Sequence, residues 1–315
     1  DLLKQTGTTE FMEFSRGALQ MVVVRLDDGA PLINKTEKDI CTEEHKDMFK
    51  PVAIARNGNT IIPDSETKFM ENDQLFLICT RDGVREALKI SGKHEIEIKS
   101  IMIVGGGRIG EMLAKKMQNV ADTIKIIEQR PERCEYLADT LSKCLIINGD
   151  GRNSDLLIEE GIKDFDAFVA VTSNSEINIL SSVAAKKMGV QKTIAEVENL
   201  EYIKLAEGMG VDAVINKKLA TAGRIFRFTL SNKVRSIKCL NGSDAEILEF
   251  IVSPDSDITK APLGLLKFPK EAIIGGITRG EEGIIVHADT MVRSYDKVVV
   301  FALPQVLSRV NRFFI

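Results

Sequence analysis

The chain has 315 residues, of which 44% are hydrophobic and 28% are charged. This length and apolar content favour two or three domains, each with its own core, and argue against a disordered chain. Forty-six acidic residues against 42 basic ones leave a net charge of −4, without the surplus of Lys and Arg that binding to a phosphate backbone requires. Nucleic acid is therefore not an expected partner.

The apolar stretches, cysteines and histidines set further limits. The longest apolar stretches, such as Val298–Leu303, have the length of a strand and fall well short of the ~20 residues that span a bilayer. Any link to a membrane is therefore expected to run through another protein. The histidines are isolated in sequence from one another and from the cysteines, so we predict no metal site. The cysteines show no close pairing and are interpreted as reduced thiols of a cytosolic protein: Cys41, Cys79, Cys134, Cys144 and Cys239.

Residues 1–92 are predicted to form a small α+β domain, part of which is repeated near the end of the chain. Arg279 lies 223 residues after Arg56, and this offset holds without gaps for about 27 residues, as in an internal duplication. In both copies the pattern predicts a strand, a turn, a second strand, a short stretch that ends in Asp, and an apolar strand. Unrelated hairpins can look alike, but five identities in one window favour duplication: Arg56/Arg279, Ile61/Ile284, Ile62/Ile285, Thr67/Thr290 and Asp73/Asp296.

The polar segment 91–97 is predicted to be a linker into a domain at 97–230, in which short apolar strands alternate with helical patterns. This alternation is typical of a parallel α/β sheet. A helix over 217–231 is expected to lead into a second small α+β domain at 231–315. Six strands, the number in a doubly wound Rossmann domain, are predicted at 99–104, 123–128, 144–148, 167–172, 193–197 and 213–215.

The predicted fold class is therefore α/β: a doubly wound parallel Rossmann sheet flanked by two small α+β domains. If one Rossmann domain followed by one small domain is the repeating unit, the chain holds one complete unit preceded by the end of another. The sequence starts at Asp1 without an initiator Met or a signal-peptide pattern. We accordingly expect a further Rossmann domain of about 130 residues upstream in the parent protein.

The segment Gly105-Gly-Gly107-Arg-Ile-Gly110 matches the pattern G-x-G-x-x-G between a predicted strand and a helix. In this pattern the first Gly permits a tight turn, the second lets the backbone approach a pyrophosphate, and the third lets the helix lie close to the strand. Amides at the helix start then face the anion. Arg108 projects from the loop and is either a phosphate ligand or an exposed surface residue.

Glu128 follows the glycine loop by roughly 20 residues, at the end of the second predicted strand, where a ribose-binding acid is expected. Its carboxylate can accept hydrogen bonds from both ribose hydroxyls and would repel a 2′-phosphate, which favours NAD or an adenine nucleotide over NADP. Arg130 weakens that preference. The alternative for Glu128 is a solvated carboxylate at a strand end.

Two further segments follow strands at the edge of the sheet where ligands bind in this fold. Asp150, after the third strand, is predicted to contact the adenine or its ribose. Thr172 to Asn178, after the fourth, carries hydroxyls that either bind the nucleotide or cap the next helix, and for Ser173 and Asn174 we favour capping.

These motifs resemble the family of domains that regulate the conductance of potassium, the RCK domains, and the chain resembles the second half of the TrkA family, the cytosolic subunits of bacterial Trk potassium uptake systems. The matching segments are Gly105–Gly110, Ile127-Glu128, Gly149-Asp-Gly151 with Leu156-Leu157, Asp166–Thr172 with Glu176–Asn178, and Gly210–Ile215. Two such units are fused in one polypeptide in that family, which agrees with the repeat that relates Arg56 to Arg279.

The resemblance implies that the chain binds NAD(H), or alternatively ATP/ADP. It implies a cytoplasmic protein that is peripheral to the inner face of the cell membrane. It also implies docking to a membrane potassium-translocating subunit and pairing of Rossmann domains into a dimer or ring. One departure is Glu196, where relatives usually carry an Arg that faces the nucleotide; an acid there should disfavour a nearby phosphate. The cofactor-binding residues so predicted are Gly105, Gly106, Gly107, Arg108, Ile109, Gly110, Glu128, Asp150, Thr172, Ser173 and Glu196.

A regulatory role is the predicted function, and an NAD-dependent dehydrogenase or reductase is the alternative, because the same fold serves both. A reductase of the short-chain type needs a Tyr with a Lys four residues later, and Tyr136, Tyr202 and Tyr295 all lack that Lys. We therefore predict no catalytic residues. A third possibility, an assembly module with a vestigial cleft, predicts no affinity for nucleotides.

Overall fold

The computed structural model describes residues 8–40, 42, 44–93, 97–219, 221, 234–239 and 245–314, with the backbone alone for 234–239. These residues fall into two compact units, one within 96–220 and one formed by 7–95 together with 221–315. The predicted α/β class is confirmed, since one unit contains a parallel sheet and the other contains antiparallel sheets.

The first unit is a six-stranded parallel sheet with strand order β11-β10-β9-β6-β7-β8, the order of a Rossmann domain. All six strands expected from the sequence are present. Their bounds are β6 (Ser100–Val104), β7 (Thr123–Glu128), β8 (Leu145–Asn148), β9 (Ala167–Ala170), β10 (Lys192–Glu196) and β11 (Ala213–Ile215).

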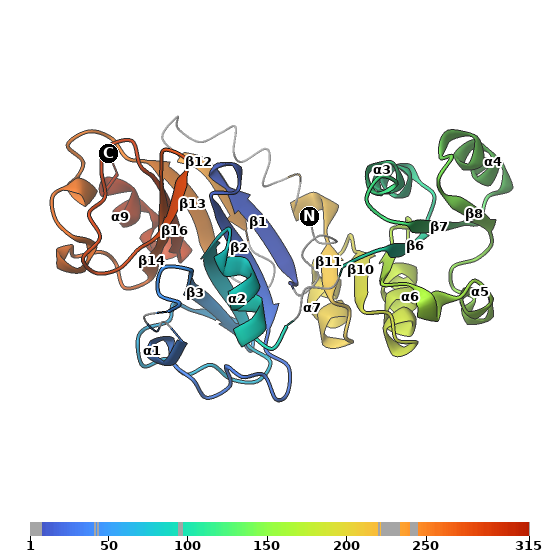
Figure 1. Ribbon diagram of the computed structural model, residues 1–315, viewed down its shortest axis with the longest axis horizontal. Helices are drawn as coiled ribbons and strands as arrows, with labels where there is room; N and C mark the ends of the chain where they lie inside the picture. Colours follow the sequence, from blue (N-terminus) through green and yellow to red (C-terminus); the bar gives the residue numbers. More distant parts are fainter. Residues whose placement is uncertain are drawn as a thin grey trace. The chain divides into compact units, whose positions relative to one another are not determined.

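Helices cover both faces of this sheet (Figure 1). Helices α3 (Arg108–Met117) and α4 (Pro131–Thr140) bury apolar side chains against one face. On the other face lie α5 (Ser154–Glu159), the short helix η2 (Ile162–Asp164), α6 (Ser175–Lys187) and α7 (Glu201–Gly208). The central strands β6 and β9 are therefore buried from both sides, which is why they consist of continuous apolar runs.

The predicted strand bounds differ from the observed ones by one or two residues. The strand expected over 167–172 ends at Ala170, and the one expected over 193–197 covers Lys192–Glu196. The first difference has a local cause, because the main-chain N–H of Thr172 donates to the side chain of Asn178 (2.9 Å) instead of to a neighbouring strand.

The second unit holds two five-stranded antiparallel sheets with the same strand order. In the first sheet, β1-β2-β5-β3-β4, α1 (Glu37–Ile40) lies between β2 and β3 in sequence and α2 (Gly83–Ile90) follows β5. The second sheet is β12-β13-β16-β14-β15, followed by α9 (Leu307–Arg312). The first sheet comprises β1 (Glu10–Phe14), β2 (Leu19–Arg25), β3 (Phe49–Arg56), β4 (Asn59–Ile61) and β5 (Gln74–Thr80). The second comprises β12 (Val234–Cys239), β13 (Glu246–Ile251), β14 (Ala272–Arg279), β15 (Glu282–Ile285) and β16 (Lys297–Ala302).

Each sheet contains hydrogen bonds of its own at equivalent positions of the repeat, which agrees with the predicted duplication. Arg56 donates two hydrogen bonds to Asp73 (both 2.7 Å), and Arg279 donates two to Asp296 (3.0 and 2.7 Å). The same Asp in each copy accepts a main-chain N–H three residues earlier, at 2.7 and 2.8 Å. A bulge interrupts the equivalent strands β3 and β14, after Pro51 and Ile274. Two unrelated hairpins would not match in these details.

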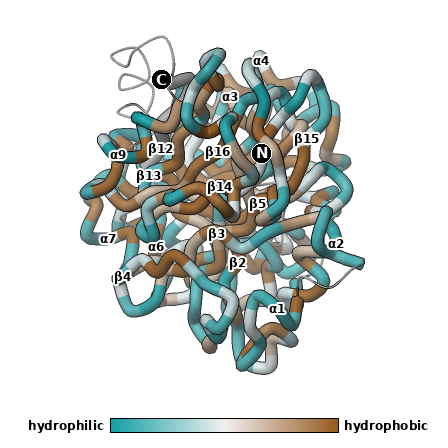
Figure 2. The backbone as a smooth tube through the Cα atoms, turned by 90° about the vertical axis from the view of Figure 1, so that its left-hand side faces the viewer, coloured by the Kyte–Doolittle hydropathy of each residue, from teal (hydrophilic) through white to brown (hydrophobic). Residues whose placement is uncertain are grey.

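The two sheets face each other through a common apolar core, to which Phe76 and Ile78 contribute from the first sheet and Val299 and Phe301 from the second. Figure 2 shows hydrophobic segments along β3, β5 and β14. Close backbone approach accompanies this packing, because a Cβ on Gly283 of β15 would lie 2.0 Å from the main-chain oxygen of Ala18.

Several predictions fall at the limits of the described residues. The predicted helix 217–231 begins as expected, with helical geometry at 217–219 and 221, and its remainder lies outside the described residues. The same is true of Cys41, of the Cys239 side chain and of residues 94–96 in the predicted linker.

Candidate functional site

The glycine loop joins β6 to α3 and adopts the tight turn that the sequence predicts. Gly105 has φ +105°, a conformation that L side chains rarely adopt, and a Cβ there would lie 2.9 Å from Thr172 N. A Cβ on Gly110 would lie 2.0 Å from the main-chain oxygen of Gly105, so this Gly permits the close approach of α3 to the loop. A Cβ on Gly107 would meet no heavy atom within 4 Å. Gly107 thus leaves space for a ligand rather than for the protein's own packing.

A cleft of about 460 Å³ opens beside this loop, at the carboxyl ends of β6, β7, β8 and β9. Six of the predicted site residues line it: Gly105, Gly107, Glu128, Asp150, Thr172 and Ser173. Arg108 and Ile109 are exposed at the start of α3, while Gly106, Gly110 and Glu196 are buried behind the surface. The cleft lies at the place where Rossmann domains bind nucleotides.

Glu128 closes β7 and is buried, with its carboxylate held beside the glycine loop. The N–H of Gly106 donates to Oε2 (2.8 Å), and the main-chain N–H and Nε of Arg130 donate to Oε1 (3.0 and 3.1 Å). Burial raises the pKa of Glu128, but the hydrogen bonds from Arg130 and Gly106 outweigh it, and the pKa lies below its ordinary value. Glu128 is therefore an ionised acceptor at neutral pH, fixed in orientation at the cleft.

Two arginines that the sequence did not single out hold parts of the site: Arg133 contacts the glycine loop and Arg152 contacts Asp150. Arg133 on α4 donates through Nε to the main-chain oxygen of Gly106 (2.7 Å) and through Nη2 to Glu111 on α3 (2.6 Å). It thereby ties the loop to both helices on that face of the sheet. Arg152 donates through Nη2 to Oδ2 of Asp150 (2.6 Å) and through Nε to Oδ1 (3.0 Å), and it lowers the pKa of that carboxyl group. Asp150 lines the cleft with its charge already paired.

Residues 172–178 cap α6 and also border the cleft. The side chain of Asn174 accepts a hydrogen bond from Ile177 N (2.8 Å) and is the N-cap, as predicted, whereas Ser173 is exposed and precedes the cap. Buried Asn178 holds Thr172 in place: its Oδ1 accepts from the N–H and hydroxyl of Thr172 (2.9 and 2.7 Å). Asn178 was not among the predicted site residues, because its role depends on contacts across the fold.

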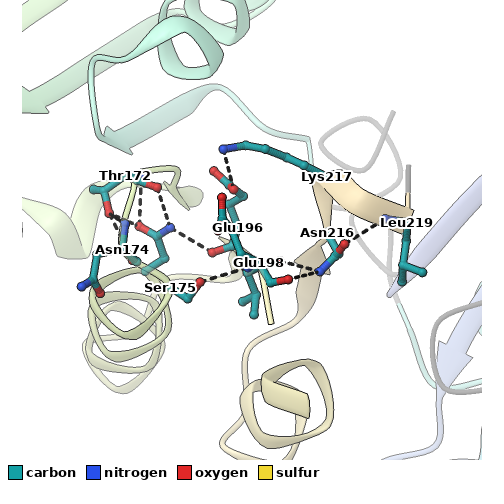
Figure 3. Close-up of polar contacts among 10 residues, drawn as sticks. Thr172, Asn174, Ser175, Glu196, Glu198, Asn216, Lys217 and Leu219 are labelled. Atoms are coloured by element: carbon teal, nitrogen blue, oxygen red, sulfur yellow. Dashed lines mark hydrogen bonds and ion pairs between the residues drawn. The ribbon is translucent and has the colours of Figure 1, made fainter. Parts of the chain in front are cut away.

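Glu196 ends β10 and does not line the cleft. Its Oε1 pairs with Nζ of Lys217 at 2.7 Å. Figure 3 shows the Lys217 side chain extending to the carboxylate from the beginning of the next helix. The negative charge that the sequence places here is thus paired with a cation. A second hollow of about 800 Å³ lies next to the cleft, with Ser173 and Asn174 bordering both, and its lining includes Glu176, Glu198 and Lys218.

The described part of the chain lacks two features that would change the interpretation of the site. No helix there is long and apolar enough to cross a membrane. No group of three His, Cys, Asp or Glu side chains in that part is arranged as a metal site would need. Among the cysteines whose side chains are described, Cys79 is buried, Cys134 and Cys144 are half-buried, and all three are free.

Comparisons with known proteins agree with this geometry. Residues 101–217 match the TrkA-N domain and residues 21–92 match the TrkA-C domain. The chain is 31% identical to a Trk system potassium uptake protein TrkA homolog of Methanosarcina mazei, over 100% of this chain and 70% of that protein. It is also 31% identical to the Trk system potassium uptake protein TrkA of Halomonas elongata, over 96% of this chain and 66% of that protein. The chain thus spans about two thirds of these relatives.

Among solved structures, the chain resembles the GsuK RCK domain, with a TM-score of 0.51 and 15% identity over 98% of this chain and 66% of that one. This likeness concerns the fold alone. The sequence relationship is more specific. The chain belongs to the TrkA family of Trk system potassium uptake proteins.

Proposed function

We propose that this chain binds NAD(H) in the cleft beside the glycine loop and that binding regulates potassium uptake. The observation that carries the proposal is the position of Glu128, whose ionised carboxylate lies at the cleft and is hydrogen-bonded to Gly106 of the loop. The first-turn amides of α3 supply donors for a pyrophosphate, since they have no partners within the helix. Glu128 supplies an acceptor for ribose hydroxyls.

The fixed negative charge of Glu128 favours NAD(H) over NADP(H), because a 2′-phosphate would lie against a carboxylate. Arg130 does not reverse this preference, since its Nε is already paired with Glu128 (3.1 Å). ATP and ADP share the adenosine and phosphates that the loop and Glu128 would contact, and they are the second candidate ligands. The terminal phosphate of ATP or ADP carries more negative charge than the pyrophosphate of NAD(H), and it would enter a cleft that Asp150 lines.

A regulatory role fits the cleft better than hydride transfer does. Hydride transfer by a dehydrogenase needs a proton donor or acceptor beside the nicotinamide, commonly His, Lys or Tyr. The lining residues of the cleft, as far as the structure describes them, include none of these three types. A sensor requires only that the ligand bind one arrangement of the protein better than another.

The family relationship supports a place for the chain in a potassium uptake system. We propose that it acts on the cytoplasmic side of the membrane, docks to a membrane potassium-translocating subunit of the Trk type, and pairs with other Rossmann domains in a dimer or ring. The small sheets are proposed to be the RCK-C-like domains of residues 1–92 and 231–315, which precede and follow the Rossmann domain at 97–230 in sequence.

Isothermal titration calorimetry of the chain with NADH, NADPH, ATP and ADP tests this proposal. We expect NADH to bind and NADPH to bind at least about tenfold more weakly, a difference of ~1.4 kcal/mol. An assay of NADH oxidation with small carbonyl compounds should show no turnover. Absence of binding for all four nucleotides would contradict the proposal, and steady oxidation would support the dehydrogenase instead.

A further inference from the structure

An ion pair between a buried carboxylate and an exposed lysine links the end of β10 to the helix that begins at Lys217. The side chain of Glu196 is 3% exposed, and its Oε1 pairs with Lys217 while its Oε2 has no hydrogen-bond partner among the described residues. A buried carboxylate that loses its cation is strongly unfavourable. Lys217 is therefore held where Glu196 is, and the two residues are expected to move together.

On its other side, Glu196 is connected to the cleft through Asn178. The Asn178 side chain donates through Nδ2 to the main-chain oxygens of Glu196 (2.9 Å) and Thr172 (3.1 Å). Its Oδ1 accepts the hydrogen bonds from Thr172 described above. Thr172 lines the cleft, so one buried amide joins a cleft residue to the strand end that carries Glu196.

A second buried amide joins the same strand end to the helix. Asn216 donates through Nδ2 to the main-chain oxygens of Val197 (2.8 Å) and Glu198 (3.1 Å), and its Oδ1 accepts from Leu219 N (2.9 Å). Figure 3 shows Asn216 between Glu198 and Leu219, beside the pair of Glu196 with Lys217. The first turn of the helix is thus fastened to the end of β10 at two points.

We propose that Thr172, Asn178, Glu196 and Lys217 form a relay that transmits nucleotide occupancy of the cleft to the helix starting at Lys217. The relay rests on the proposed function, since it needs a ligand in the cleft. A ligand oxygen that accepts the hydroxyl hydrogen of Thr172 takes that donor from Asn178, so the two states of the cleft differ in how Asn178 is held. Through its Nδ2 bond this difference reaches Glu196, and through the ion pair of the buried Glu196 carboxylate it reaches Lys217.

Hydrogen exchange measured by mass spectrometry, with and without saturating NADH, tests the relay. In the unmodified chain we expect NADH to slow exchange in peptides covering 105–112 and 172–180, and also at 216–221, where Leu219 N–H is the reporter. Coupling of this kind is expected to change exchange at Leu219 about fivefold or more. In Lys217→Met the slowing at 105–112 should remain while the slowing at 216–221 is lost.

Three further variants make the result specific to the ion pair. Lys217→Arg keeps a cation for Glu196 and should restore the slowing at 216–221. Glu196→Gln keeps the shape of the side chain but removes its charge, and should reduce the slowing. Lys218→Met is the matched control, because Lys218 is the neighbouring exposed lysine and has no ion pair among the described residues.

The possible outcomes separate the two proposals. Two results would overturn the relay and leave the proposed function intact. One is slowing of exchange confined to the cleft peptides of the unmodified chain, and the other is full slowing at 216–221 in Lys217→Met. Absence of slowing in every peptide would overturn the proposed function and the relay with it. Loss at 216–221 in Lys217→Met, with restoration in Lys217→Arg, supports the relay.

Discussion

The N–H of Gly106 donates to the Oε2 atom of Glu128 across 2.8 Å, so the glycine loop and the end of β7 are joined by a hydrogen bond to a buried charge. This bond makes Glu128 both a part of the fold and a part of the cleft. It therefore predicts that changes at Glu128 affect stability as well as ligand affinity.

Replacing Glu128 with Gln should lower the free energy of unfolding at neutral pH by about 1.5–3 kcal/mol, the contribution of hydrogen bonds to a charged group. The pKa of Glu128 is lower in the folded chain than its ordinary value of 4.5. Ionised Glu128 therefore stabilises the fold above pH 4.5, and this contribution is lost as the pH falls through the lowered pKa. Urea unfolding of both proteins should give a difference that shrinks in acid; a constant difference would argue against this role.

Gly107 and Gly110, two glycines of the loop, should respond differently to substitution. Gly107→Leu places a side chain where no protein atom lies within 4 Å, so stability should be unchanged while NADH affinity falls about 100-fold, or ~2.7 kcal/mol. Gly110→Leu should instead destabilise the fold by about 1–3 kcal/mol or more, because its Cβ collides with Gly105 O. Calorimetry and thermal unfolding measure the two effects. Unchanged affinity in Gly107→Leu would count against the cleft as the binding site.

The equivalent Arg–Asp pairs of the two small sheets, Arg56 with Asp73 and Arg279 with Asp296, should contribute equally to the free energy of unfolding. Asp73 and Asp296 are 0% and 3% exposed and accept the same set of hydrogen bonds from Arg56 and Arg279. Asp73→Asn and Asp296→Asn should each cost about 1.5–3 kcal/mol. Urea unfolding measures both. Glu66→Gln is the control, because the ion pair of Glu66 with Lys38 is exposed and such a pair contributes little to the free energy of unfolding. An effect in one copy alone would contradict the equivalence.

Gly283 should be intolerant of any side chain because of the packing of one small sheet on the other. In Gly283→Ala the added Cβ would lie 2.0 Å from Ala18 O, a backbone atom that cannot move without shifting a strand. We expect destabilisation of about 1–3 kcal/mol in thermal unfolding. Gly208→Ala, at a helical position with no atom within 4 Å, should be neutral or stabilise by up to ~1 kcal/mol. A neutral Gly283→Ala would mean that the two sheets separate easily.

The sequence was sufficient for the Rossmann unit because its signals are local. Each strand of a parallel sheet is a short apolar run, and the glycine loop and Glu128 follow at fixed positions from the first two strands. The partners of the site residues were not predictable in this way. Arg133 contacts Gly106 and Asn178 contacts Glu196 only after strands and helices have been placed side by side.

In the small sheets, the ungapped comparison revealed the last three strands and missed the equivalence of the first two. Gln20 lies opposite Cys79, and Glu246 holds the equivalent place opposite Ala302. Ala302 follows Cys79 at the same offset that separates Arg279 from Arg56, but Glu246 follows Gln20 at an offset three positions longer. This small difference in the connecting segments hides the first half of the repeat from a comparison at one offset.

Covalent fusion of the two sheets allows contacts that a symmetric dimer would have to make twice or not at all. His287 lies 2.9 Å from Asp47 across the two copies, but the positions equivalent to Asp47 and His287 hold Lys270 and Asp64. In a homodimer every substitution appears on both sides of the two-fold axis. In the fused chain a substitution changes one copy only, so each copy can accumulate its own charges. The two sheets can therefore evolve different specialisations.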